Sequence, residues 1–258
     1  MEIYLTNLVV AAGFMVAVWL VSVALRDASI VDPVWGLAFV AIAWATLLQL
    51  GGPSEASARS LLVVALVTIW GLRLAIYLGW RNAGKGEDFR YVRMRERIGP
   101  SFWWVSLFVV FLFQAGLAWV VSLPVQGAQE PATDLGPLDL GGLVLWGVGL
   151  AFESVGDLQL VRFKGDPANR DKVLDRGLWR YTRHPNYFGD FCVWWGLYLV
   201  AASSGAWWTV IGPLLMSFLL LRISGVALLE RTIGERRPGY EAYVRRTSAF
   251  FPRPPRGD

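Results

Sequence analysis

The segment RGLWRYTRHPNYFGD at 176–190 holds the densest set of side chains able to bind a polar ligand. Its arginines offer planar guanidinium donors that suit phosphate oxygens. Its tyrosines offer rings that can stack on a base or a nicotinamide, together with hydroxyl donors. These residues are Arg176, Arg180 and Arg183, with Tyr181 and Tyr187. We therefore expect this segment to bind a ligand that carries both phosphates and rings.

The second half of the segment adds hydrogen-bonding groups of the opposite kind. Pro185 favours an extended conformation at His184, and Asn186 is predicted to be a turn residue or the N-cap of the next helix. The first amides of that helix would then be available to an anion. Gly189 allows a ligand to approach the backbone closely, and the Asp190 carboxylate can accept hydrogen bonds from ribose hydroxyls or a carboxamide.

The composition indicates a membrane protein. Apolar residues make up 55% of the 258 residues and charged residues 17%, whereas soluble domains carry about 25% charged residues. The single cysteine, Cys192, excludes an internal disulfide, and the single histidine, His184, excludes a His-cluster metal site. The net charge of +4 is too small to indicate nucleic-acid binding. We expect neither a bound metal nor a nucleic-acid partner.

Apolar stretches of the length that a bilayer core requires occur seven times. The sixth is short and the seventh follows within a few residues, so these two are predicted to form a tight hairpin. The chain is therefore expected to be an all-α integral membrane protein with about seven transmembrane helices and a polar loop at 126–138. The stretches are 4–25, 30–50, 60–80, 102–125, 139–161, 188–204 and 207–229.

The basic residues predict the orientation of these helices. Of the 24 Lys and Arg residues, 21 lie in the connections after the first, third and fifth stretches and in the C-terminal tail. Positively charged connections remain in the cytoplasm. We therefore expect the N-terminus outside and the C-terminus in the cytoplasm, and 1–258 to form a single membrane domain.

Seven charged side chains fall inside or at the ends of the apolar stretches, where charge is costly unless it faces protein or water. Glu153 and Asp157 are four residues apart on one helix face, so they repel unless cations such as Arg162 and Lys164 lie near. Buried ion pairs that hold helices together, such as Arg73 with Asp32, are the alternative. As a group the seven favour a polar cavity open to the cytoplasm. They are Asp32, Arg73, Glu153, Asp157, Asp190, Arg222 and Glu230.

These motifs resemble a known family. Residues 139–258, with Asp157 and GLWRYTRHPNYFGD, resemble the C-terminal domain of the steroid 5α-reductase family, particularly its bacterial seven-helix branch. The string HPNYFGD is also similar to the cofactor segment of Δ14-sterol reductases. GEDFRYVRMRERIG at 86–99 and SIVDPVWG at 29–36 look like the bacterial branch as well. The resemblance covers nearly the whole chain.

The resemblance implies a membrane oxidoreductase of lipid or steroid metabolism. NADPH would reduce the C=C bond of an α,β-unsaturated carbonyl, typically a 3-oxo-4-ene steroid or a similar lipid enone. Residues 1–125 would supply the substrate-side helices and residues 139–258 the NADPH-binding half. The protein would lie in a bacterial inner membrane with its cofactor site facing the cytoplasm. It would contact membrane lipid and its hydrophobic substrate, and no obligate protein partner is expected.

Carried over residue by residue, the resemblance implies how NADPH is held. Asp157 would hold a polar group of the cofactor, and Lys164, where the family usually has Arg, would contact its phosphates. Asn186 and Asp190, the latter in place of a family Glu, would fix the nicotinamide ribose or carboxamide. Tyr181, Arg183 and Tyr187 would line the pyrophosphate and rings, and Glu230 (in place of a family Tyr), Tyr243 and Arg246 would close the site. Glu153, Arg162, Arg176 and His184 complete the predicted cofactor-binding set.

The substrate side departs from the family. Eukaryotic members place a Gln-Glu pair and a Tyr beside the steroid ketone, and the apolar stretches here contain no such pair. Asp32 is the predicted acid or the residue that orients the acid. Arg73 and Tyr77, four residues apart on one helix face, are the predicted donors to the developing enolate oxygen.

Two other functions fit parts of the pattern. An isoprenylcysteine-type S-adenosylmethionine-dependent membrane methyltransferase also has an RHPxYxG string, and a late Glu before a tail that Tyr240 and Tyr243 imitate. The methyl donor carries no phosphate, so the cations around 162–183 favour NADPH. An ion-coupled transporter would also have charges within its helices, but the sequence shows no inverted repeat of the usual kind.

Overall fold

The computed structural model describes residues 1–130, 134–223 and 239–256, and among these residues it contains helices and no β-strand. Five helical segments are long and apolar enough to cross a membrane. They confirm the first five predicted stretches as helices and fit a multi-pass membrane protein. The five segments are Glu2–Leu25, Ala28–Gln49, Ala58–Asn82, Phe89–Val121 and Pro137–Gly165.

The chain divides into two compact units. Unit 1 consists of Met1–Gly136 with Ala201–Ile211, and unit 2 of Pro137–Val200 with Gly212–Asp258. Unit 1 thus includes a short piece of the predicted cofactor half, residues 139–258. Each unit is described separately below.

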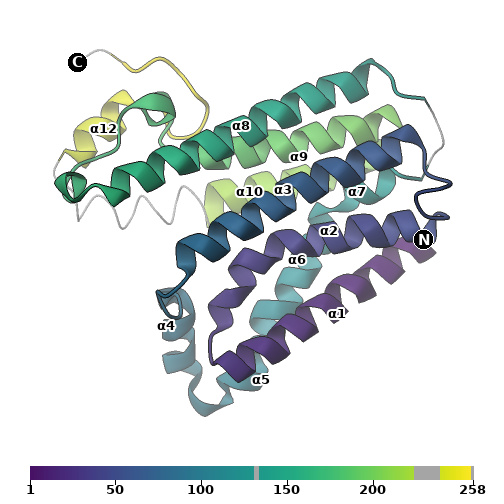
Figure 1. Ribbon diagram of the computed structural model, residues 1–258, viewed down its shortest axis with the longest axis horizontal. Coiled ribbons are helices and arrows are strands. Elements are labelled where there is room, and N and C mark those ends of the chain that lie inside the picture. The colour runs from purple at the N-terminus through teal and green to yellow at the C-terminus, as the bar shows by residue number, and fades with distance from the viewer. Residues whose placement is uncertain (131–133, 224–238, 257–258) are drawn as a thin grey trace. The chain divides into compact units, whose positions relative to one another are not determined.

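Unit 1 is built on three long helices that lie side by side, α1 (Glu2–Leu25), α2 (Val31–Gln49) and α3 (Ala58–Asn82) (Figure 1). A Cβ atom built on Gly71 of α3 would lie 2.7 Å from the carbonyl oxygen of Gly36 in α2. Glycine at both positions therefore allows the backbones of α2 and α3 to approach closely where they cross.

The fourth predicted stretch is longer and less regular than expected. It begins with α4 (Phe89–Ile98) and continues as α5 (Phe102–Ser106), a π-helical turn (Leu107–Leu112) and α6 (Phe113–Val121). Gly99, with a φ of +73°, ends α4 and separates it from the apolar part. Figure 1 shows α4 turning away from the direction of α3.

The prediction of a polar loop at 126–138 is wrong in its first part. The short helix α7 (Leu123–Gly127) is buried, as are the residues that follow it up to Gln129. Burial is tolerated because the amides are hydrogen-bonded: Asn7 Nδ2 donates to Gln126 Oε1 at 3.0 Å, and Gln129 Nε2 donates to Val125 O at 3.0 Å. A polar composition did not distinguish a buried segment whose amide groups donate or accept hydrogen bonds from an exposed loop.

Unit 2 contains α8 (Pro137–Gly165) and most of α9 (Pro185–Ser203). Trp195 Nε1 in α9 donates to Ser217 Oγ of α10 (Ile211–Phe218) at 3.1 Å, which joins the sixth and seventh predicted stretches as a hairpin. A π-helical turn follows at Leu219–Ile223, and the rest of the seventh stretch lies outside the described residues. The last helix is α12 (Tyr240–Arg246). Short 3-10 helices occupy Ala28–Ile30, Gly99–Ser101, Pro167–Asn169, Gly177–Arg180 and Trp207–Val210.

Candidate functional site

Helices α8 and α9 meet along a seam of glycines. A Cβ atom built on Gly149 would lie 2.5 Å from the carbonyl oxygen of Gly189, and one built on Gly142 would lie 2.6 Å from that of Gly196. These distances leave no room for a side chain, so glycine is what allows the two backbones to approach so closely. The seam brings polar residues of the two helices within reach of one another.

Two predicted cofactor residues meet across this seam. Asn186 Nδ2 donates to Asp157 Oδ1 at 3.4 Å, and Asp157 is only 5% exposed. One turn earlier in α8, Glu153 is also buried, and its Cγ would lie 2.7 Å from a Cβ atom on Gly189. Both carboxylates therefore lie on the side of α8 that faces α9, as their spacing of four residues predicts.

The prediction that Asn186 caps α9 is wrong. The helix begins at Pro185, so Asn186 lies in its first turn, and its Oδ1 accepts a hydrogen bond from the N–H of Tyr187 at 3.1 Å. Proline is favoured at the first helical position because its φ is already helical and its missing N–H would have had no partner there. Asp190 lies one turn later on α9 and is partly buried.

The segment before α9 is attached to α8 and to the C-terminal tail. Trp179 Nε1 donates to Gly156 O at 3.1 Å. Thr182 and Ser248 form an isolated parallel β-bridge. Four hydrogen bonds join segment and tail: Tyr243 Oη to Trp179 O at 2.6 Å, Thr182 Oγ1 to Phe250 O at 2.7 Å, Arg183 N to Ser248 O at 2.9 Å, and Arg253 N to Tyr181 O at 3.0 Å. The predicted ligand-binding segment is therefore held on both sides.

Aromatic rings reinforce this attachment. Phe188 and Phe191 of α9 pack edge-on against Phe250 and Phe251 of the tail, with ring centroids 5.6 to 6.1 Å apart. Edge-to-face pairs of this kind add roughly 0.5–1.5 kcal/mol each beyond area burial. The tail thus packs against the start of α9, where the predicted cofactor residues are most dense.

The remaining predicted cofactor residues of unit 2 differ in burial and in contacts. The rings of His184 and Tyr187 stack at 5.5 Å with an interplanar angle of 11°. Four side chains are exposed, namely Arg162, Lys164, Arg176 and Tyr181. Arg183 is buried, and Arg246 forms an ion pair with Asp175 at 3.5 Å. Glu230 lies outside the described residues.

In unit 1, Asp32 is held by α4. Arg90 Nη2 lies 2.5 Å from Asp32 Oδ2, and the Tyr91 hydroxyl donates to Asp32 Oδ1 at 2.8 Å. The Asp32 side chain is 20% exposed, and Tyr91 is buried. The ion pair that the structure gives Asp32 is with Arg90 of α4, and the alternative pair with Arg73 of α3 stays a prediction.

Arg73 and Tyr77 lie on one face of α3, as predicted. The Arg73 guanidinium lies over the Tyr77 ring at 5.4 Å from its centroid, and Arg81 lies over the same ring at 5.6 Å. Both arginines are one turn from the tyrosine, so these cation–π contacts follow directly from the helical spacing. Two donors thus lie within one turn of each other in this part of α3.

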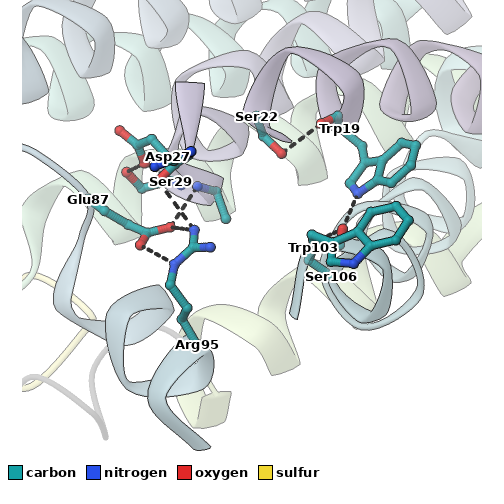
Figure 2. A network of polar contacts seen from close by, with 10 residues as sticks. Trp19, Ser22, Asp27, Ser29, Glu87, Arg95, Trp103 and Ser106 are labelled. Carbon is teal, nitrogen blue, oxygen red and sulfur yellow. Dashed lines mark hydrogen bonds and ion pairs between the residues drawn. The ribbon is translucent and has the colours of Figure 1, made fainter. Parts of the chain in front are cut away.

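The turn that carries Asp32 is fixed by a second polar network, shown in Figure 2. Glu87 Oε1 accepts hydrogen bonds from the Ala28 N–H and from Arg95 Nη2, both at 2.8 Å. Asp27 Oδ1 accepts from the Ser29 N–H at 2.8 Å and so caps the short helix Ala28–Ile30. The connection between α1 and α2 is therefore tied to the segment that contains α4.

Asp88 extends the network around Asp32. Its Oδ1 caps α4 by accepting from the Arg90 N–H at 2.9 Å, and it also accepts from Arg90 Nε at 2.8 Å. Partial burial raises the pKa of Asp88, but the hydrogen bonds and charge of Arg90 outweigh it, so the pKa lies below its usual value. Arg90 therefore links the cap of α4 to the carboxylate of α2.

Comparison with known proteins decides the family. Residues 18–247 match the family described as "Protein of unknown function (DUF1295)". The chain belongs to this family. A curated relative in the same comparison, the uncharacterized protein C594.04c of Schizosaccharomyces pombe, is 29% identical over 269 residues, which cover 91% of this chain and 75% of the relative. No solved structure matches this chain.

In this DUF1295 protein, sequence reasoning missed Arg90 and Tyr91, the two residues that contact Asp32. The string that contains them, at 86–99, contributes only to the resemblance to the steroid 5α-reductase family. The sequence contains a signal for a helix here, because charged and apolar residues of 86–97 each recur at helical spacing. Such a pattern predicts a short amphipathic helix, although it does not tell which carboxylate the inward arginine contacts.

Proposed function

We propose that this protein is a membrane reductase that uses NADPH to reduce the C=C bond of an α,β-unsaturated carbonyl, a 3-oxo-4-ene steroid or a similar lipid enone. The proposal includes seven membrane spans, with the N-terminus outside and the C-terminus in the cytoplasm. It assigns cofactor binding to unit 2 and activation of the carbonyl to unit 1. The sequence resemblance to the steroid 5α-reductase family supports this assignment.

The observation that carries the proposal is the contact between Asp157 and Asn186. It joins an acceptor-only carboxylate to an amide with both donors and acceptors. Hydroxyls of ribose and the carboxamide of nicotinamide need this combination of donors and acceptors. The Tyr187 ring lies in the same turn of α9, is stacked on the buried His184 ring and is itself only partly buried, so it suits contact with an aromatic ring.

The charges of unit 2 fit a phosphorylated dinucleotide. Exposed cations precede the Asn186 turn, at the end of α8 and on the segment that α8 and the tail hold. Guanidinium and ammonium groups would contact the pyrophosphate and the additional phosphate that distinguishes NADPH from NADH. These cations are Arg162, Lys164 and Arg176.

The cofactor and the protein would each perform a different part of the reduction. NADPH supplies the hydride when bound. The task of the unit 1 side chains is to stabilise the charge that develops on the carbonyl oxygen and to deliver a proton. Arg73 and Tyr77 are the donors toward that oxygen. Asp32 acts through Tyr91, because the carboxylate accepts a hydrogen bond from the Tyr91 hydroxyl and orients it.

The test is nucleotide binding to the purified full-length protein in detergent. We expect saturable NADPH binding that is tighter than NADH binding. Asn186→Ala should weaken it roughly ten- to a hundredfold, which corresponds to about 1.4–2.8 kcal/mol. Ser154→Ala, on an exposed part of α8, serves as the matched control and should bind normally.

Two outcomes would overturn the proposal. Equal affinity for NADPH and NADH would contradict the reading of the cations as phosphate ligands. Saturable binding of S-adenosylmethionine without NADPH binding would favour the methyltransferase. Enone reduction is then measured as NADPH oxidation with 3-oxo-4-ene steroids and with shorter lipid enones, which separates the two substrate classes.

A further inference from the structure

The outward side of α4, with the end of α3, carries cations and large aromatic side chains. Arg93 and Arg97 are exposed on α4, and within the described chain neither forms an ion pair. Arg93 lies over the exposed ring of Phe89 at 5.3 Å. Exposed cations and aromatics continue back to the end of α3. We call this set the α4 surface, and its members are Trp80, Arg81, Lys85, Phe89, Arg93 and Arg97.

The other two cations of the same helix are paired with carboxylates. Arg95 is paired with Glu87 at 2.8 Å, and Arg90 is paired with Asp32 and Asp88. Between residues 81 and 97 the only exposed acidic side chain is that of Glu96. Glu87 and Asp88 therefore form ion pairs within unit 1, and the α4 surface has an excess of positive charge.

The place of α4 in the chain determines which anions it can meet. It follows α3, which ends at Asn82, and forms the charged first part of the segment Phe89–Val121, whose apolar part begins at Phe102. Trp103 and Trp104 follow directly and are exposed. Tryptophans at the ends of membrane helices lie at the level of the lipid headgroups. A short helix bounded in this way lies at the membrane interface.

We propose that the α4 surface binds the anionic headgroups of phospholipids in the membrane that holds this protein. A basic amphipathic helix with aromatic side chains has the chemistry that interfacial helices use. Arg93 and Arg97 would contact the headgroup phosphates, while Phe89 and Trp80 would lie among the upper acyl chains. This binding does not depend on the proposed reductase function.

The experiment uses the full-length protein, delipidated in detergent and titrated with phosphatidylglycerol or phosphatidylcholine. Bound lipid is counted by native mass spectrometry, and binding is followed by the shift in melting temperature. We expect tighter binding of phosphatidylglycerol, weakened by added salt because the surface charges are screened. In the double variant Arg93→Gln, Arg97→Gln the affinity should fall roughly 30-fold, since each cation near an anionic surface contributes on the order of 1 kcal/mol.

A matched control separates this surface from general basicity. Arg253→Gln with Arg256→Gln removes two exposed cations of unit 2 and should leave the affinity unchanged. The variant Arg93→Lys, Arg97→Lys keeps the charge and should retain binding, and it remains informative if the glutamine variant does not fold. Glycerol phosphate in solution should not displace the lipid, because the aromatic contacts require acyl chains.

Three results would overturn the proposal. Equal binding of the two lipids would show that charge is not recognised. An equal loss in the α4 and unit 2 variants would show that the effect is not specific to this surface. Full displacement by glycerol phosphate would identify a site for free phosphate rather than a lipid surface.

Discussion

Two carboxylates, one in each unit, are held in different ways. Asp32 in unit 1 is contacted by Arg90 and Tyr91 from a helix about 60 residues later in the chain. Asp157 in unit 2 is contacted by Asn186 where α8 and α9 approach each other at glycine. The first position depends on long polar side chains near the start of a short helix, and the second depends on the distance between two backbones.

The two sites should therefore be sensitive to different kinds of substitution. In unit 1 a change of charge removes the interaction but leaves the helices packed, since α2 and α3 meet elsewhere at Gly36 and Gly71. In unit 2 a single methyl group in the seam separates the helices that bear the polar residues. Substitutions of charge should therefore affect unit 1 most in its chemistry, and substitutions of size should affect unit 2 most in its stability.

The largest expected effect is that of Asp32→Asn on enone reduction. Asparagine keeps the size of the side chain but removes the charge that orients Tyr91 and pairs with Arg90. We expect NADPH affinity to stay unchanged and the single-turnover rate of NADPH oxidation to fall by roughly 10²- to 10⁴-fold, the usual contribution of a positioned acid–base group. Rate and melting temperature are measured on the same preparation.

Asp27→Asn is the control, because asparagine caps helices as well as aspartate does and Asp27 lies five residues earlier in the same turn. It should keep the wild-type rate. If Asp32→Asn instead lowers the melting temperature while turnover per folded molecule is preserved, Asp32 serves only to hold helices together. That result would remove the substrate-side part of the proposed function.

Much of the fold could be predicted from the sequence, because apolar length is a local property. Four of the first five stretches are helices within a few residues of their predicted limits, and the fourth belongs to a longer helical segment that begins at Phe89. The buried segment at 126–129 was missed because its burial depends on hydrogen bonds from helices far away in the chain. Hydropathy counts a glutamine as polar whether or not its amide has partners.

The candidate site was predictable in its residues more than in its contacts. The string at 184–190 identified Asn186 and Asp190, but not that Pro185 would begin the helix in place of an Asn186 cap. Asp32 was selected as a charge at membrane depth, yet its partner Arg90 comes from a segment that hydropathy treats as a connection. Partners of this kind are decided by tertiary packing, which a single sequence does not record.

The second largest effect is expected from Gly189→Ala in the seam. The new Cβ atom would lie 2.5 Å from the Gly149 carbonyl oxygen and 2.7 Å from the Glu153 backbone nitrogen, so α8 and α9 must separate. We expect a loss of stability of about 3 kcal/mol, at the upper end of the usual cost of overpacking. Thermal unfolding in detergent measures it.

Gly147→Ala is the matched control on α8, since a Cβ atom there would have no neighbour within 4 Å. It should be neutral or slightly stabilising, because alanine is a better helix former than glycine. Equal melting temperatures for Gly189→Ala and the wild type would mean that the two helices are not held together by close backbone contact. The contrast between the two units would then disappear.

The smallest effect is expected at the start of α4, from Asp88→Ala. The substitution removes the cap on the Arg90 N–H and one of the two carboxylates that contact the Arg90 guanidinium. Loss of an N-cap costs about 1 kcal/mol, and the ion pair adds little because the Arg90 side chain is 42% exposed. The melting temperature should therefore fall only slightly at neutral pH.

The pH dependence of this effect follows from the lowered pKa of Asp88. A carboxyl group whose pKa is lower in the folded state stabilises that state above its unfolded pKa, and this contribution is lost as the pH falls through the folded pKa. The difference between wild type and Asp88→Ala should therefore narrow in acid. Asp88→Asn keeps a capping oxygen without the charge, so it should be less destabilised than the alanine variant, and its difference from wild type should also narrow in acid. Equal losses of melting temperature in the two variants would mean that the charge on Asp88, rather than its capping oxygen, stabilises α4. The stability of the helix that contacts Asp32 would then depend on this charge.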